Sequence, residues 1–122
     1  MELYRAKKNG EWIYGGVYDT ISDAFFDYLV VEENGELRRV VVDDFTRCRY
    51  TGFSVNDVKI FDKDILKLEM PKNNDEMNIK FEITIVIDSS QSYHLNLLEQ
   101  ATHIEILGNS IENQDLVQEL FQ

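Results

Sequence analysis

The sequence predicts a mainly β protein that forms a small antiparallel barrel with added hairpins and a short C-terminal helix. Two observations lead to this fold class. Apolar residues alternate with polar ones along several short runs, and this period of two is typical of half-buried strands. Asn-Gly pairs, which favour two-residue hairpin turns, separate two pairs of these runs.

Two hairpins are predicted in the N-terminal third. Residues 3–8 and 11–18 flank Asn9-Gly10, and residues 25–32 and 36–42 flank Asn34-Gly35. Residues 20–29 allow two interpretations, because Ser22 is also a suitable N-cap for a short helix; we favour a strand from Phe25 onward. Asp43-Asp44 is expected to begin one helical turn before residues 47–50.

Further strands are predicted in the second half of the chain. One covers residues 64–70 and ends at Pro71, which begins an exposed, polar loop at about 71–77. The alternation is clearest in residues 79–87, and Asp88-Ser89-Ser90-Gln91 is turn material after it. Two more runs alternate, and their apolar members are Tyr93, Leu95 and Leu97, then Ile104 and Ile106.

The C-terminal residues predict a short amphipathic helix. Asn113 is a good N-cap, and Asp115 in the first turn suits the helix dipole. A helix this short is marginal alone and must dock on the sheet or on a neighbouring subunit. Its apolar face is therefore our candidate interaction surface, made of Leu116, Val117, Leu120 and Phe121.

Length and composition predict one domain over residues 1–122 in a reducing compartment. A chain of 122 residues with 43% hydrophobic content can bury a real core. The single Cys48 cannot form an internal disulfide, and the N-terminus has no apolar signal region. We expect a cytoplasmic protein without membrane association, and Cys48 as a small strand residue.

The charge is strongly negative and unevenly placed. The net charge is −11, and residues 81–122 contain no Lys or Arg. Such a surface repels phosphate backbones, so direct binding to nucleic acid is not expected. Most of this charge is expected to be solvated surface. The alternative is an acidic face that binds a basic partner or imitates nucleic acid to a host DNA-binding protein.

Candidate sites for chemistry are few and weak. His94 and His103, both expected on the polar sides of strands, would need a carboxylate such as Glu105 nearby to hold a metal ion. Two acidic pairs, Asp62 with Asp64 and Asp43 with Asp44, could bind a cation if they met, although 23 acidic residues make chance proximity expected. We therefore predict no catalytic residue, no metal site and no cofactor, and keep a metal-dependent enzyme as an alternative.

Aromatic residues on the second predicted strand raise the question of base stacking. Trp12, Tyr14 and Tyr18 share one face, as in platforms that bind single-stranded nucleic acid. The positive groove that such platforms need is missing, so core packing or a protein interface is the better interpretation. The chain also lacks the glycine-rich fingerprints of nucleotide-binding loops and the G-x-S-x-G elbow of a serine nucleophile.

Three segments together resemble the YopX family of phage and prophage proteins. The first is Y-R-A-K followed by G-E-W-I-Y-G in residues 4–15. The second is Y-T-G-F at 50–53 followed by K-I-F-D-K-D-I-L at 59–66, and the third is I-L-G-N-S-I-E-N-Q-D-L at 106–116. Their order and spacing span nearly the whole chain.

This resemblance implies a phage or prophage origin and an SH3-like barrel, but no activity and no catalytic residues. It implies turns at Gly52 and Gly108, and core positions for Tyr50 and Ile65. The chain departs from the family pattern at four places. The loop after Gly52 is one residue shorter, Asn56-Asp57 stands where Asn-Gly is usual, Lys63 replaces a glycine, and Gln114 replaces a proline.

Together these observations predict an accessory protein of a phage or prophage. It is expected to act by binding another protein or by homo-oligomerisation rather than by catalysis.

Overall fold

The structure is a computed structural model that describes residues 3–16, 28–71 and 80–121. The predicted mainly β class is confirmed, because nearly all described elements are strands and their pairing is antiparallel. The chain divides into two compact units, Met1–Tyr50 and Thr51–Gln122. The single domain expected over residues 1–122 stays a prediction.

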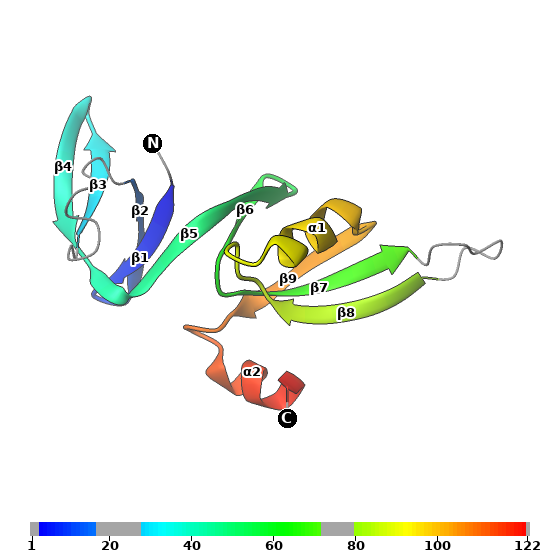
Figure 1. The fold of residues 1–122 in the computed structure, drawn as a ribbon. Coiled ribbons are helices and arrows are strands. Elements are labelled where there is room, and N and C mark those ends of the chain that lie inside the picture. The colour runs from blue at the N-terminus through cyan, green and yellow to red at the C-terminus, as the bar shows by residue number, and fades with distance from the viewer. Residues whose placement is uncertain (1–2, 17–27, 72–79, 122) are drawn as a thin grey trace. The chain divides into compact units, whose positions relative to one another are not determined.

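Both predicted N-terminal hairpins are confirmed (Figure 1). Strands β1 (Tyr4–Lys8) and β2 (Glu11–Gly15) pair across Asn9-Gly10, and β3 (Tyr28–Glu33) and β4 (Glu36–Val41) pair across Asn34-Gly35. In both turns Asn and Gly have positive φ, near 50° and 81°. This left-handed pair is what a type I′ turn requires, so the Asn-Gly signal has a direct structural cause.

Among the described residues of the first unit, four buried side chains form a core cluster, against which Tyr4, Ile13 and Val31 pack. The four are Ala6, Leu29, Val40 and Val42. A short antiparallel bridge joins Gly16 to Val30, so the two hairpins are tied through the backbone as well. Tyr18, Ser22 and Phe25 lie outside the described residues.

The helical turn expected at Asp43-Asp44 is wrong. These residues begin β5 (Asp43–Val55), which pairs with β1, and Asp43 lies opposite Lys7. Local turn chemistry is present, since Asp43 Oδ1 accepts a hydrogen bond from the Phe45 amide at 3.1 Å. Pairing with β1 nevertheless keeps this segment in a strand, and the irregularity in the β1–β5 pair is a register shift between Arg5 and Lys7. Cys48 is a buried strand residue, as expected.

The second unit is a three-stranded antiparallel sheet with two helices. After β6 (Val58–Phe61), the sheet order is β8 (Lys80–Val86), β7 (Asp64–Pro71) and β9 (His103–Asn109). The predicted strands at 64–70 and 79–87 are thereby confirmed within the described residues, as is the one around Ile104. Apart from Pro71, which ends β7, most of the expected loop at 71–77 lies outside them.

The alternating run at Tyr93, Leu95 and Leu97 is not a strand. It lies in helix α1 (Ser92–Gln100), which packs on β7, and the helix buries His94 and Leu98, four residues apart (Figure 1). Leu97 and Leu98 pack on the same core, and adjacent residues of a strand would point to opposite faces, so this pattern fits a helix. The helix start is weakly marked, because Gln91 at the N-cap makes no side-chain capping bond.

The core of the second unit is centred on β7. Ile60, Leu66, Leu68, Met70, Ile87 and Leu98 form a buried cluster, and Leu95, Leu97 and Ala101 from the α1 region pack against it. Ile65 is fully buried, as the resemblance implied, whereas Tyr50 is half-buried. Burial of this apolar surface, at about 25 cal/mol per Å², is the main stabilisation available to the unit.

Three of the described non-glycine residues of this unit adopt the left-handed conformation at turns. Asn56 and Asp57, between β5 and β6, have φ of 50° and 66°. Lys63, between β6 and β7, has φ of 73°, and its backbone bonds both to Ile87 and to Ser110. Lys63 thus keeps the conformation that a glycine would adopt there without strain.

Removing a core leucine should destabilise the protein strongly. Leu68→Ala leaves a cavity beneath β7 and should lower the free energy of unfolding by about 2–5 kcal/mol. The matched control Leu120→Ala removes the same atoms from an exposed helix position and should cost less than about 1 kcal/mol. Urea unfolding followed by circular dichroism measures both, and equal losses would contradict the assigned core.

Replacing Lys63 by glycine should not destabilise the protein. The left-handed φ costs a β-carbon-bearing residue of order 1 kcal/mol, and glycine removes that cost. Lys63→Gly should therefore match or exceed the wild-type free energy of unfolding. Lys67→Gly, inside β7, should lower it by about 1 kcal/mol. The same urea experiment compares the two, and a loss at both positions would argue against the turn geometry.

Candidate functional site

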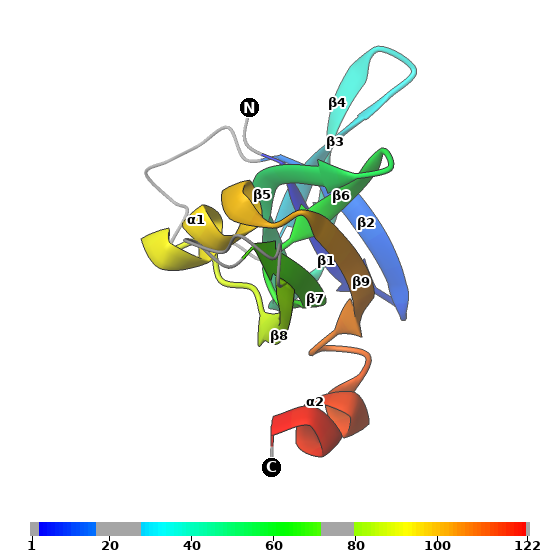
Figure 2. The ribbon, with the colours of Figure 1, turned by 90° about the vertical axis from the view of Figure 1, so that its right-hand side faces the viewer.

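Helix α2 (Gln114–Phe121) is the clearest unpartnered element of the second unit. None of its residues is buried, and Figures 1 and 2 show it apart from the β8-β7-β9 sheet. The predicted helix is confirmed, whereas its expected docking onto the sheet is not seen. On the proposed apolar face, Leu116 and Val117 are half-buried, and Leu120 and Phe121 are 41% and 48% exposed.

A closed loop of hydrogen bonds connects β9 to α2. The Asn113 side-chain oxygen accepts a bond from the Asn109 amide at 3.0 Å, and the Asn109 side chain accepts bonds from the amides of Ile111 and Glu112. Asn113 precedes the helix as predicted, but its side chain is turned back to the strand. A β-carbon on Gly108 would lie 2.5 Å from the Asn113 side-chain oxygen, so only glycine fits there.

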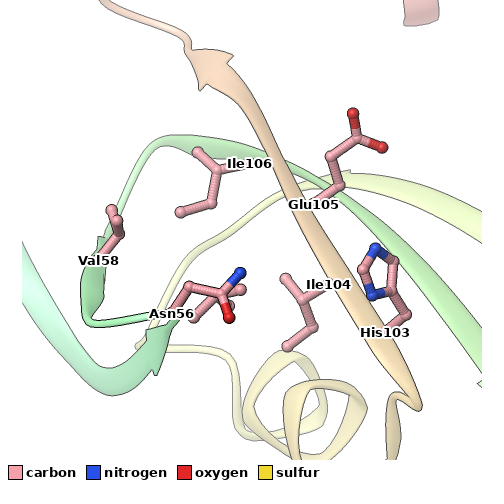
Figure 3. A pocket seen from close by; sticks show the side chains of 7 residues that line it. Asn56, Val58, His103, Ile104, Glu105 and Ile106 are labelled. Atoms are coloured by element: carbon pink, nitrogen blue, oxygen red, sulfur yellow. The ribbon is translucent and has the colours of Figure 1, made fainter.

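A pocket of about 360 Å³ lies beside β9 (Figure 3). One wall is β9 itself, and the other is the turn between β5 and β6. Ile104 and Ile106 face the hollow, whereas Glu105 points away from it. The lining is mostly apolar and consists of Val55, Asn56, Val58, His103, Ile104, Glu105 and Ile106.

The strand beside this pocket is an edge of its sheet. Within the described part of the chain, the sheet order places β7 on one side of β9 and no strand on the other. Alternate backbone groups of an edge strand point away from the sheet and are free to pair with another chain. A β-bulge interrupts the regular part, because the register shifts between Ile65 and Leu66 opposite Gly108 and Ile106.

The solvent face of this sheet carries alternating charges. Lys67 of β7 pairs with Glu82 of β8 at 3.5 Å, and Lys80 of β8 pairs with Glu69 of β7 at 3.0 Å. Hydrogen bonds from Lys80 and then Thr102 lower the pKa of Glu69, and the charge of His103 acts in the same direction. On β9, Glu105 lies opposite Lys67 and His103 lies opposite Glu69.

The two histidines occupy different environments. The expectation that both lie on the polar sides of strands is wrong for His94, which is buried in α1 and accepts a hydrogen bond from the Asp88 amide at its Nδ1, 3.1 Å away. His103 is exposed on β9. Across residues 3–16, 28–71 and 80–121, no group of three His, Cys, Asp or Glu side chains is placed to hold a metal ion.

The carboxylates singled out in the sequence form hydrogen bonds or ion pairs with other residues of the chain. Asp62 accepts two hydrogen bonds from Ser89, at 2.7 Å from its amide and 2.8 Å from its hydroxyl. Asp64, which is buried, accepts one from the Phe61 amide at 2.9 Å. Asp44, in the other unit, forms an ion pair with Arg47 at 3.1 Å. These contacts give the acidic residues structural roles.

Trp12 of β2 packs against two cations. Arg5 and Lys7 lie over the Trp12 ring, 4.3 and 4.6 Å from its centroid. Tyr14 is half exposed, and Tyr18 lies outside the described residues. Trp12 is therefore covered by the side chains of its own hairpin and is not an open stacking platform.

Comparisons of the chain with family models, with curated proteins and with solved structures found no match. Among the helices of the described residues, neither is long and apolar enough to cross a bilayer. The site is thus defined by its own geometry. The sequence led to the α2 face through its helical spacing, but it missed the pocket, because the β5–β6 turn and β9 are about 50 residues apart.

Replacing Ser90 by alanine should raise the pKa of Asp88. The Ser90 hydroxyl, 2.7 Å from Asp88 Oδ1, and the Ser90 amide both stabilise the carboxylate and lower its pKa from the ordinary 3.8. The stabilisation of the folded state by these hydrogen bonds is fully present above the ordinary pKa, and it is lost as the pH falls through the lowered pKa of Asp88. Carboxyl NMR titration of Ser90→Ala should show an upward shift, and Ser92→Ala, its control, no such shift.

Proposed function

We propose that this chain is an accessory protein of a phage or prophage that binds another protein through the apolar face of α2. The observation that carries the proposal is a helix with a continuous apolar face and no buried residue. Isolated helices of this length are unstable in water, so a partner that covers Leu116, Val117, Leu120 and Phe121 would stabilise the helix as it binds.

The charge around α2 defines the partner. Glu119 neighbours the apolar face, Asp115 lies in the first turn of the helix, and no Lys or Arg follows Lys80 in the chain. The matching surface is an apolar groove bordered by Lys or Arg. A second copy of α2 fits this position poorly, because its own Glu119 would approach a like charge.

Kinship with the YopX family belongs to this proposal, together with its SH3-like barrel and a place in the host cytoplasm. Three backbone features support it. Lys63 has positive φ at a position where the family has glycine, and Asn56-Asp57 forms a left-handed turn where Asn-Gly is usual. Within the third signature segment, a β-carbon on Gly108 would meet the Asn113 side chain, which supports a pairing of glycine with asparagine there.

A second candidate function is an acidic mimic of nucleic acid. The observation in its favour is the complete lack of Lys and Arg in residues 81–122. A mimic would bind a basic DNA-binding protein through many carboxylates, so binding should fall steeply with salt. Binding through α2 depends on apolar contacts and should persist at high salt, and this difference separates the two functions.

Charge on the apolar face of α2 should abolish partner binding. Leu120→Glu places a carboxylate in the contact and should remove the partner from affinity purifications of induced host cells at high salt. Because hot-spot side chains contribute more than about 2 kcal/mol, the purified partner should bind this variant at least about 30-fold more weakly in calorimetry.

Gln118→Glu is the matched control, since it adds the same charge to an exposed position outside the apolar face. It should leave the high-salt affinity unchanged. Equal binding by wild type and Leu120→Glu would contradict the α2 proposal, and loss of all binding in salt would favour the mimic.

A further inference from the structure

Strand β9 presents an open edge next to an apolar pocket. Its segment from His103 to Ile106 contains no Lys and no Pro, the residues that commonly protect exposed edges. We propose that β9 pairs antiparallel with β9 of a second copy of this chain, which joins two three-stranded sheets into one. This inference goes beyond the binding function of α2 and does not depend on it.

The side-chain pattern of β9 is self-complementary in one register. A two-fold axis perpendicular to the sheet keeps each residue on its own face, so a residue pairs only with one of the same parity. With the axis at Ile104, the two Ile104 side chains lie opposite each other on the pocket face. On the other face, His103 of each copy lies opposite Glu105 of the other.

The neighbouring registers lack this complementarity. An axis at Glu105 would place two carboxylates directly opposite each other, and an axis at His103 would oppose two imidazoles. Like charges at directly opposed positions destabilise a sheet, whereas opposite charges contribute about 0.2–1 kcal/mol per pair. Charge therefore favours the register centred on Ile104, and the two-fold symmetry provides two equivalent His103–Glu105 contacts.

The same register continues the charge pattern already present in the sheet. Within one copy, Glu82 pairs with Lys67, and Lys67 lies opposite Glu105. In the second copy, His103 lies opposite Glu69, which pairs with Lys80. Across the proposed interface the row alternates in sign from β8 of one copy to β8 of the other, with the His103–Glu105 contact at the centre.

The pocket gives the second strand a place to bury its apolar face. Val55, Val58, Ile104 and Ile106 line the hollow, and Val58 is 56% exposed (Figure 3). Ile104 from the second copy would enter on this side and remove apolar surface of both chains from water. The apolar and the charged faces of β9 thus favour the same occupant.

A charge-exchange experiment on the full chain tests the pairing. Sedimentation velocity should show a reversible dimer for the wild type at concentrations up to about 1 mM. In a dimer of Glu105→Lys, both symmetry-related contacts place the new lysine opposite His103. In a dimer of His103→Glu, both contacts place two carboxylates opposite each other. Each variant alone should therefore dimerise at least about tenfold more weakly than the wild type. Mixed in equal amounts, the two variants restore both opposite-charge pairs and should form a heterodimer, which native mass spectrometry identifies by its mass.

The mixing step separates a pairing defect from a folding defect, because two misfolded chains would not rescue each other. Glu99→Lys, the same charge change on the exposed side of α1, is the control and should dimerise like the wild type. A monomeric wild type at all concentrations would overturn the inference, and so would single variants that dimerise like the wild type or fail to form the heterodimer. Leu120→Glu should leave the β9 dimer intact, so failure here and failure of the α2 proposal are distinguishable.

Discussion

The burial of β7 is the constraint on which the second unit depends. Five of the residues between Asp64 and Met70 are buried, and the strand is paired on both sides, with β8 and β9. One sheet face must then be covered, and α1 does this with Leu98 and its apolar neighbours. Because β7 lies between β8 and β9 and no further described strand pairs with either, these two strands are the edges of the sheet.

The turns and strands were predictable because their signals are local. An Asn-Gly pair specifies a left-handed turn through the φ values of its own two residues, whatever the rest of the chain does. Helix α1 was not predictable in the same way, because Tyr93, Leu95 and Leu97 fit a strand, and only the packing of the adjacent Leu97 and Leu98 on one core contradicts it. The helix is chosen by the need to cover β7, which is information from outside the segment.

The candidate site also has one part that local sequence signals predict and one part that they do not. The apolar face of α2 could be read from helical spacing, whereas the pocket could not, since it forms where the β5–β6 turn and β9 meet. The signature-like residues proved to be structural. Asp64 holds a turn, and Asn109 and Asn113 close the loop that leads into α2. Residues of this kind specify a shape and do not indicate an activity.

The two proposed surfaces differ in the way that charge selects their occupants. Helix α2 itself carries only acidic charges, Asp115 and Glu119, so the proposed contact would repel a second copy and attract a basic partner. On β9 a carboxylate and an imidazole stand at positions that the proposed two-fold symmetry would oppose, so a second copy would be the complementary partner. A net charge of −11 opposes self-association in general. Self-pairing therefore requires local alternation of sign, and the outer face of the β8-β7-β9 sheet is where the described residues provide it.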